Sequence, residues 1–307
     1  MIIRKQIVLV DQPDGALRSL EQSLGDSGYQ ILLVSEATML LDTIENQRRL
    51  ALVIINGRQF GVMGASLVSI IKLQHPELPI IYCQDPQAPT TFFAQRPDCI
   101  ITGTVSVDLV NQDANTLLRE GLYPPVLVEG LQNIAREMLS SFGSFSVSDE
   151  PFLKTRRTLL LPLNAMIPLV GSQHMEGHLF VSATEDTLQR AYTTLFGEEP
   201  GSIAVLEDLA GEICNMIAGG LKSFIEQKGT SVVIGVPTFV RGNQISFRRG
   251  TPTPSLTLGA TLEGKPDVAG ANGDDLFIEL YFERIDPAIF QSVDQVQQLD
   301  AEEMTFL

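Results

Sequence analysis

Short apolar runs alternate with amphipathic stretches throughout residues 6–121, and this alternation constrains the fold more than any other feature of the sequence. Short apolar runs bounded by turn residues are typical of buried strands, and the amphipathic stretches between them fit helices. A strand–helix repeat predicts an α/β fold with a doubly wound parallel sheet, most naturally of flavodoxin-like order. The expected strands are 6–11, 29–35, 50–56, 78–84 and 98–103, and the expected helices are 15–28, 37–49, 64–75, 90–95 and 106–121.

A break follows this repeat at residues 120–126, "EGLYPPV", where a glycine and two prolines prevent a helix from continuing. A chain of 307 residues is long enough to form two cores. We therefore expect one domain at 1–121, a second at 122–285, and an acidic tail at 286–307 that forms a helix docked on the protein or on a partner.

The second part of the chain has a different order of elements. A helix is expected first, then strands on both sides of two further helices, which predicts an α+β domain with a mostly antiparallel sheet. The glycine- and aspartate-rich segment 263–275 predicts a mobile hairpin loop between the last two strands. The expected helices are 126–143, 185–199 and 202–228, and the expected strands are 156–171, 175–184, 230–242, 244–250, 255–264 and 275–285.

Charge narrows the class of function. The chain has 21 Lys and Arg against 37 Asp and Glu, and its net charge of −16 would repel nucleic acid and anionic lipid.

The N-terminal apolar run is too short for a signal peptide or a membrane span, so we expect a cytoplasmic protein with no membrane insertion. The cysteines and histidines lack metal-ligand spacing, so no metal and no bound cofactor are expected. The residues concerned are Cys83, Cys99, Cys214, His174 and His178.

The helix expected at 202–228, with Ser202 as N-cap and Gly229 at its end, carries two stripes when projected at about 100° per residue. One stripe is apolar and predicts the core side. The other is polar and faces the opposite way, which makes Glu212 and Asn215 neighbours on an outward strip. The apolar stripe contains Ile203, Leu206, Ala210, Ile213, Ile217 and Phe224, and the polar stripe contains Asp208, Glu212, Asn215, Gly219 and Lys222.

Three glycines, Gly211, Gly219 and Gly220, cluster around this pair. Each costs a helix about 1 kcal/mol relative to alanine. Either another element packs closely on the helix, or the bare backbone beside Asn215 lets a partner approach. In the simplest alternative, Glu212 and Asn215 are solvated surface residues and the glycines are packing contacts.

The first 121 residues resemble the receiver domain of bacterial response regulators. The resemblance covers roughly residues 4–121 and rests on "IVLVDQ", on "LPIIYCQ", and on "LVIINGRQFGVMG", whose Gly61 and Gly64 are spaced as in the family's loop after the third strand. In that family an aspartate at the end of the third strand accepts phosphate. An acidic pair after the first strand holds Mg²⁺, and a Ser or Thr and a Lys complete the switch.

Four of those five positions differ here, and only Asp11 is retained. A carboxamide is no nucleophile, and loss of acidic residues weakens the cation site. The resemblance therefore implies an inactive pseudo-receiver, serving as a docking or dimerisation surface or only as a structural partner. The substitutions are Gln12 for the second acid, Asn56 for the phosphoacceptor, Gln84 for the hydroxyl residue and Thr102 for the lysine.

Residues 125–285 resemble the CheC/CheX/FliY group of chemotaxis phosphatases, and most closely the CheX type, through "LEDLAGEICNMIAGGLKSF" and "GVPTFVRG". The motif residues are Asp208, Glu212, Asn215 and Pro237. The family lays this helix across a phosphorylated receiver, where the carboxylate pairs with the receiver's lysine and the carboxamide orients the attacking water. "VEGLQNIAR" spaces its Glu and Asn four apart instead of three, so one active helix is expected.

The resemblance implies an aspartyl-phosphate phosphatase acting on a CheY-like response regulator, with the pseudo-receiver targeting or regulating it. Glu212 and Asn215 would be the catalytic pair, and any Mg²⁺ would come with the phosphorylated partner. The resemblance also implies a homodimer. The alternative is a non-catalytic binding or scaffold protein that sequesters response regulators.

Overall fold

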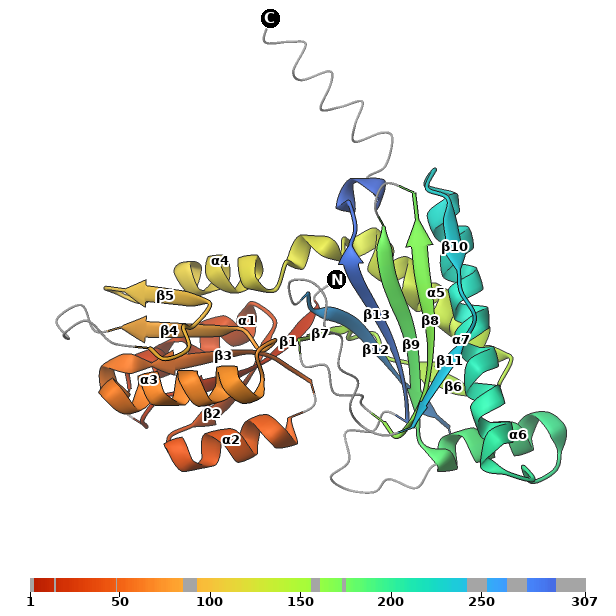
Figure 1. Ribbon diagram of the computed structural model, residues 1–307, viewed down its shortest axis with the longest axis horizontal. Helices are drawn as coiled ribbons and strands as arrows, with labels where there is room; N and C mark the ends of the chain where they lie inside the picture. Colours follow the sequence, from red (N-terminus) through yellow and green to blue (C-terminus); the bar gives the residue numbers. More distant parts are fainter. Residues whose placement is uncertain are drawn as a thin grey trace, which may run out of the picture.

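The computed structural model describes residues 3–13, 15–47, 49–84, 93–155, 161–172, 175–241, 253–263 and 275–290. Its helices and strands form two halves that lie side by side, and a single sheet runs through both of them (Figure 1).

The N-terminal half alternates strands and helices as expected. Its strands are parallel in the order β2-β1-β3-β4-β5, which is the predicted flavodoxin-like order. The elements are β1 (Arg4–Val10), the 3₁₀ turn η1 (Ala16–Leu20), α1 (Glu21–Asp26), β2 (Tyr29–Val34), α2 (Ala37–Asn46), β3 (Leu50–Asn56), α3 (Gly57–Gln74), β4 (Ile80–Gln84), β5 (Cys99–Thr102) and α4 (Val107–Leu117).

Alternate side chains of β1 explain why helices cover both faces of this sheet. Val8 and Val10 are buried in a cluster with α2 and α3, whereas Ile7 and Leu9 are buried in a second cluster with α1 and α4. A parallel strand buried on both faces must be apolar along its whole length, which is how the sequence reads.

Two local predictions need correction. A helix was expected at 64–75, with a loop between it and the third strand. Instead, α3 begins at Gly57, directly after the last residue of β3. Gly61 and Gly64 therefore lie within the helix. The helix expected at 90–95 falls partly on residues 85–92, outside the described ranges, and residues 93–95 are not helical.

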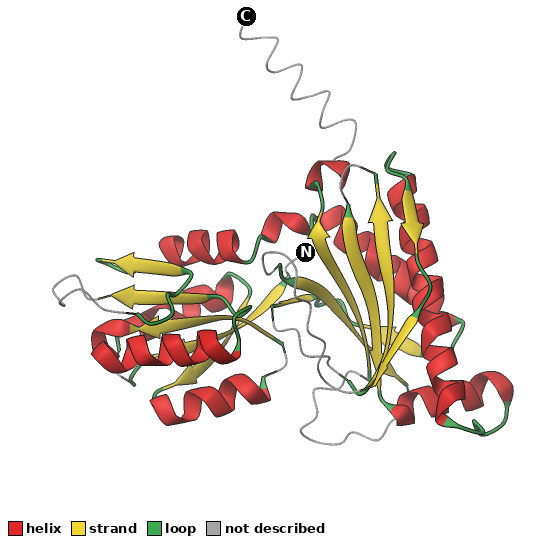
Figure 2. Cartoon of the chain, in the orientation of Figure 1, coloured by secondary structure: helices red, strands yellow, loops and turns green. Residues whose placement is uncertain are grey.

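The C-terminal half is a strongly bent antiparallel sheet with helices on one face (Figure 2). The order is β10-β8-β9-β13-β12, and β11 also pairs with β8 while β6 and β7 pair with β12. The predicted, mostly antiparallel sheet is therefore confirmed. The elements are η2 (Glu120–Leu122), α5 (Pro125–Ser140), β6 (Phe145–Val147), β7 (Phe152–Lys154), β8 (Leu163–Gly171), β9 (Glu176–Ala183), α6 (Glu185–Phe196), α7 (Ile203–Glu226), β10 (Val232–Ile234), β11 (Thr238–Arg241), β12 (Ser255–Leu262), β13 (Leu276–Arg284) and η3 (Pro287–Phe290).

Several expected segments of this half turn out differently or fall outside the description. The single strand expected at 230–242 is two short strands, because Gly235 and Pro237 lie in the break between them. Predictions for 244–250, for 264–274 and for 291–307 lie outside the described residues. The start of the predicted tail is instead a 3₁₀ turn whose Phe290 is buried against the ring of Phe224.

Strand β7, which the sequence analysis missed, joins the two halves. It pairs antiparallel with β12 and parallel with β1, where Arg4 and Lys5 face Phe152 and Leu153. The Thr155 hydroxyl lies 2.9 Å from the carbonyl oxygen of Ala51 in β3. The sheet of the N-terminal half therefore continues into the sheet of the C-terminal half.

The boundary predicted at residues 120–126 is attached to the C-terminal half by hydrogen bonds. Pro124 and Pro125 do end one helical segment and start α5, as their missing N–H groups require. Tyr123, however, is fully buried, and its hydroxyl lies 2.8 Å from the carbonyl oxygen of Pro254 and 3.1 Å from that of Leu280. The connection between the halves is thus part of the C-terminal core.

Candidate functional site

Helix α7 spans Ile203–Glu226, close to the predicted 202–228. Ser202 is the N-cap by backbone conformation, although its side chain makes no capping hydrogen bond. Gly229, just past the end, has φ of +86°, a left-handed conformation that favours glycine. The predicted start of the helix is confirmed, and its last residue, Glu226, comes two positions before the predicted residue 228.

The apolar stripe lies where it was predicted. Leu206, Ala210, Ile213 and Ile217 are buried, and the helix packs on β8, β9 and α5. The buried arc is wider than the predicted stripe because neighbours lie on more than one side of the helix. It also includes Leu209, Cys214, Ala218, Leu221 and Ile225.

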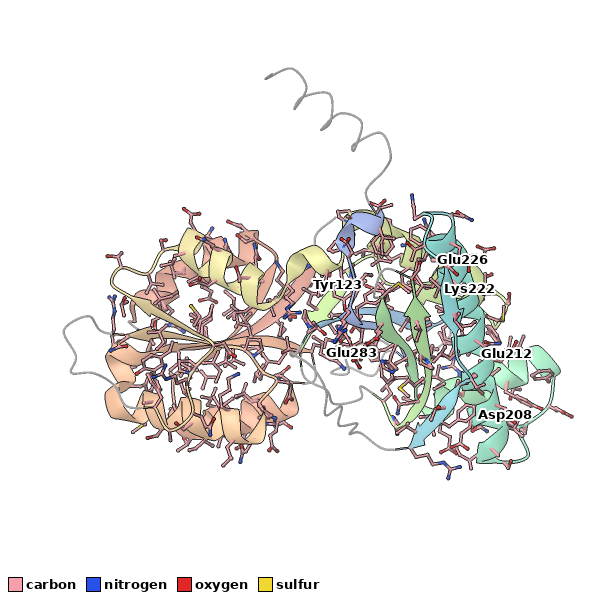
Figure 3. The ribbon with its side chains drawn as sticks, turned by 45° about the horizontal axis from the view of Figure 1, so that its top comes forward. Tyr123, Asp208, Glu212, Lys222, Glu226 and Glu283 are labelled. Carbon is pink, nitrogen blue, oxygen red and sulfur yellow. The ribbon has the colours of Figure 1, made fainter. Side chains whose placement is uncertain are left out.

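The polar strip faces outward. Asp208, Glu212 and Asn215 are all exposed, and Figure 3 shows Asp208 and Glu212 along the outer side of α7. Lys222, further along the strip, lies 3.8 Å from Glu226 at its Nζ and Oε1 atoms. Within the described ranges, no hydrogen bond or ion pair engages the side chains of Asp208, Glu212 or Asn215. Their polar groups are available to water or to a partner.

The three glycines of α7 have two different roles. A Cβ on Gly211 would lie 2.6 Å from the ring of Phe239 on β11, and one on Gly220 would lie 2.6 Å from Ile134 on α5. These two glycines permit close packing. A Cβ on Gly219 would meet nothing within 4 Å. Gly219, one turn after Asn215, therefore leaves bare backbone next to open space.

Strand β11 borders the strip. Pro237, predicted from the motif, directly precedes this strand, and its Cβ is 3.8 Å from the position that a Cβ on Gly211 would occupy. At the other end of the strand, Arg241 donates to Glu207 of α7, with 3.0 Å between Nη2 and Oε2. This hydrogen bond lowers the pKa of the Glu207 carboxyl. The pairing ties β11 to α7, and the sequence analysis did not identify it.

Exposed apolar side chains accompany the strip. Val236 is 80% exposed and Phe239 is 41% exposed, and they lie on either side of Pro237. The sequence signal for them is the "VPTFVR" run, which was interpreted as a strand and as part of the CheX-type motif but not as an exposed apolar surface. Apolar groups of this kind beside polar groups are typical of surfaces that contact another protein.

The altered Glu–Asn spacing on α5 produces a different arrangement. Glu129 and Asn133 are both exposed, but the Asn133 oxygen accepts a hydrogen bond from Arg136 at 3.0 Å. Arg136 in turn binds Asp149 at 2.6 Å. The carboxamide on α5 is already engaged, in contrast to that of Asn215.

Asp11 and Asn56, the two residues predicted from the receiver resemblance to stand at the degenerate phosphorylation site, are brought together and buried. Asn56 Nδ2 donates to Asp11 Oδ1 at 2.7 Å, and the Asn56 oxygen accepts from the N–H of Arg58 at 3.2 Å, capping α3. The Asp11 carboxylate also accepts three backbone N–H bonds, from Gln12, Leu17 and Arg18 at 3.0, 2.8 and 3.2 Å.

This arrangement does not fit a Mg²⁺ ion. Donor groups already surround both oxygens of Asp11, and a Cβ on Gly15 would lie only 2.0 Å from that carboxylate. The exposed Gln12 follows Asp11, while Gln84 and Thr102 pair across the ends of β4 and β5. A bound Mg²⁺ needs oxygen ligands around it, but the groups that surround the Asp11 carboxylate are N–H donors.

Comparison with known proteins gives a family for part of the chain. Residues 163–259 match the family model described as "Chemotaxis phosphatase CheX", a span that includes all of α7 and Pro237. No curated protein matches the chain. A helix able to cross a membrane is absent from the described ranges, since none is both long and apolar enough.

Among solved structures, a chemotactic CheC-like protein from Shewanella oneidensis MR-1 is 25% identical, with a TM-score of 0.41, over 54% of this chain and 99% of its own. The CheX–CheY–BeF₃–Mg²⁺ complex from Borrelia burgdorferi is 18% identical, with a TM-score of 0.39, over 51% and 97%. A response regulator from Thermotoga maritima is 9% identical, with a TM-score of 0.31, over 38% and 99%. The family match therefore indicates a CheX-type domain within the C-terminal half of the chain, over residues 163–259.

Proposed function

We propose that the polar strip of α7 is the active face of a phosphatase that hydrolyses the aspartyl phosphate of a separate CheY-like response regulator. The observation that carries the proposal is the exposed pair Glu212 and Asn215, unengaged within the described ranges, inside a segment that matches the model of a chemotaxis phosphatase. Gly219 supports it, because the backbone beside the pair has room for a partner's surface.

The chemistry suits a carboxamide. In the hydrolysis, a water oxygen attacks phosphorus, the bond to the aspartyl oxygen breaks, and the products are a free carboxylate and inorganic phosphate. An aspartyl phosphate is already activated, so the enzyme mainly has to hold water in line with that bond. Asn215 can accept from water and donate without bringing a negative charge to the phosphoryl oxygens.

Glu212 has a different role in the proposal. Its carboxylate, one turn from Asn215, would pair with a lysine of the partner receiver and fix the register of the two proteins through a charge-assisted bond. Any Mg²⁺ would be held by that partner, where it would supply positive charge beside the phosphoryl group. Asp208 adds a second carboxylate at the end of the strip.

The substrate would be another chain rather than this chain's own N-terminal half. Asn56 cannot carry the phosphate. In addition, β4 and β5 point away from α7, so the carboxyl ends of the parallel strands lie at the far side of the molecule from the strip (Figure 1). The N-terminal half is free to serve in targeting or regulation, and homodimerisation of the chain remains part of the proposal.

The decisive experiment follows the decay of a receiver labelled with ³²P. The full chain at substoichiometric concentration should shorten the lifetime of the phosphorylated receiver, with release of inorganic phosphate. A scaffold that only sequesters the regulator would leave the lifetime unchanged or lengthen it, and that result would overturn the proposal. Light scattering on the same samples tests for a dimer.

A further inference from the structure

A cleft of about 360 Å³ lies where the two halves meet, at the opposite end of β1 from Asp11. It is formed by the first residues of β1 and β2, the turn before β3, and the segment that leads into β7. Its volume is at the lower end of the range for small-molecule sites, about 300–1,000 Å³. Its lining residues are Arg4, Gln6, Tyr29, Gln30, Arg49, Ser148, Glu150 and Phe152.

Gln6 is the feature that points to a ligand. Its side chain is 8% exposed, yet its Oε1 atom is buried and has no hydrogen-bond partner among the described residues. A buried acceptor left without a donor destabilises the folded protein, because it loses its hydrogen bonds to water without replacement. Buried side-chain oxygens are nearly always satisfied, so this atom calls for a donor that a ligand can supply.

Two arginines add positive charge to the cleft. Arg4 pairs with Glu150 at 2.7 Å, but both side chains are well exposed, so this ion pair is weak and another anion can compete for the guanidinium. Arg49 lies over the rings of Phe152 and Phe277, at 4.7 and 5.3 Å from their centroids. The two rings hold the guanidinium in the cleft, and its planar set of N–H donors suits the recognition of an anion.

We infer that this cleft binds a small organic anion that also carries N–H donors, the chemistry of a nucleoside monophosphate. The anionic group would contact Arg4 and Arg49, and a base N–H would donate to Gln6 Oε1. Exposed Gln30, which pairs with Gln6 across β1 and β2, would supply a second amide. The two arginines outweigh Glu150, so the cleft is a local cationic site on a chain with a net charge of −16.

Such a ligand would touch both halves of the molecule. Arg4, Gln6, Gln30 and Arg49 belong to the N-terminal half, while Phe152 belongs to β7 of the C-terminal half. Binding would therefore stabilise the junction at which the two sheets join. This inference does not depend on the chemistry of α7.

The test is isothermal titration calorimetry of the full chain with GMP, AMP, CMP and UMP, and with inorganic phosphate and guanosine as half-probes. At least one nucleotide should bind at micromolar to millimolar concentration, and more tightly than either half-probe. Gln6→Met and Arg4→Met should each weaken binding by about tenfold or more, as loss of a charge-assisted or buried hydrogen bond does. Arg190→Met, on α6, is the control and should leave binding unchanged.

Other outcomes overturn the inference. These are no binding of any of the four nucleotides at millimolar concentration, equal binding of phosphate or guanosine alone, or wild-type binding by Gln6→Met. If Gln6→Met fails to fold by circular dichroism, Gln30→Met on the exposed wall replaces it. Amide NMR of the wild-type chain then decides, because a bound nucleotide must shift the side-chain resonances of Gln6.

Discussion

Two carboxylate–carboxamide pairs occupy opposite ends of this molecule and differ in almost everything except their functional groups. Asp11 and Asn56 are buried, bonded to each other at 2.7 Å, and surrounded by backbone N–H groups. Glu212 and Asn215 are exposed, and no described residue engages their side chains. A polar pair that is fully satisfied inside a protein is a structural element, whereas one that faces solvent retains its capacity for chemistry.

The positions of the two pairs explain the contrast. Asp11 and Asn56 lie at the ends of neighbouring parallel strands. Helix α3 begins directly after Asn56 and η1 begins at Ala16, and the first residues of these two elements donate backbone N–H groups to the pair. Glu212 and Asn215 sit in the middle of one helix, whose own backbone groups are already hydrogen-bonded to each other.

Converting the buried pair into two acids should be the most damaging change. Asn56→Asp places a second carboxylate against Asp11, so we expect a loss of about 3–5 kcal/mol in the free energy of unfolding at neutral pH. The crowded pair favours holding a proton in the folded state. The deficit relative to wild type should therefore grow as pH rises above about 4, the usual range of an aspartate.

Urea unfolding at several pH values measures this deficit, with Glu212→Gln as the exposed control. We also expect no uptake of phosphate from acetyl phosphate by Asn56→Asp, as judged by intact mass, because the Mg²⁺ site is not restored. Wild-type stability of this variant at neutral pH would show that the Asp11–Asn56 site is not the closed structure described above.

Removing the exposed carboxamide should affect rate rather than stability. Asn215→Ala should lower the rate at which the protein dephosphorylates a receiver by about a hundredfold or more, because an aligned catalytic hydrogen bond is lost. Its melting temperature should stay near that of wild type, since an exposed side chain contributes little to stability. Asn133→Ala, an exposed asparagine on the neighbouring helix α5, is the matched control and should retain full activity.

The assay is the receiver-decay measurement, run alongside thermal melts of all three proteins. Equal activity of Asn215→Ala and Asn133→Ala would remove the distinction between the two helices. A collapse of the melt would instead make Asn215 a structural residue, like Asn56.

Substituting the adjacent glycines of α7, Gly219 and Gly220, can distinguish a role in helix packing from a role in partner access. Gly219→Ala should raise stability by up to about 1 kcal/mol, because helix propensity improves and the methyl group meets open space. Gly220→Ala gains the same propensity but places a methyl 2.6 Å from Ile134, and overpacking of this kind costs about 1–3 kcal/mol. The free energies of unfolding should therefore move in opposite directions.

Receiver decay with the same two variants tests the second half of this idea. Gly219→Ala should bind the receiver more weakly despite its greater stability, because the methyl group occupies the approach beside Asn215. If both variants change stability alike and leave decay untouched, Gly219 has no role in partner access.

The smallest effect is expected for the exposed carboxylate. Glu212→Gln should raise KM for the phosphorylated receiver by about fivefold to tenfold, since a solvent-exposed ion pair with a lysine contributes about 1 kcal/mol. The value of kcat should change less, and stability should stay within about 0.5 kcal/mol of wild type. KM should also lose part of its salt dependence. A fall in kcat with unchanged KM would place Glu212 at the reacting atoms instead of at the docking contact.

Much of the local structure could be predicted from the sequence. The five parallel strands, the ends of α7 and the exposure of Asp208, Glu212 and Asn215 follow from periodicity, caps and turn residues within a short window. The errors fall where local signals are weak. Strand β7 is only three residues long, and α3 begins at Gly57 because Asn56 caps it at once.

Relations between distant residues could not be predicted in this way. Asp11 and Asn56 are 45 positions apart, and nothing near either one indicates the bond between them. Which α7 glycines are packing contacts and which one faces open space depends on Phe239 and Ile134, which lie on β11 and α5. The cleft exists only because β7 brings Phe152 and Glu150 beside Arg4 and Gln6.

Local sequence patterns are therefore enough to predict most of the strands and helices. They also place Glu212 and Asn215 together on an outward strip, because side-chain direction repeats with the period of the backbone. Contacts between distant segments determine which polar pair has all its hydrogen bonds, which glycine faces open space, and how the two sheets join. Those outcomes depend on which groups meet after the chain has folded, and burial and hydrogen bonding give the same side chains opposite roles in the two places.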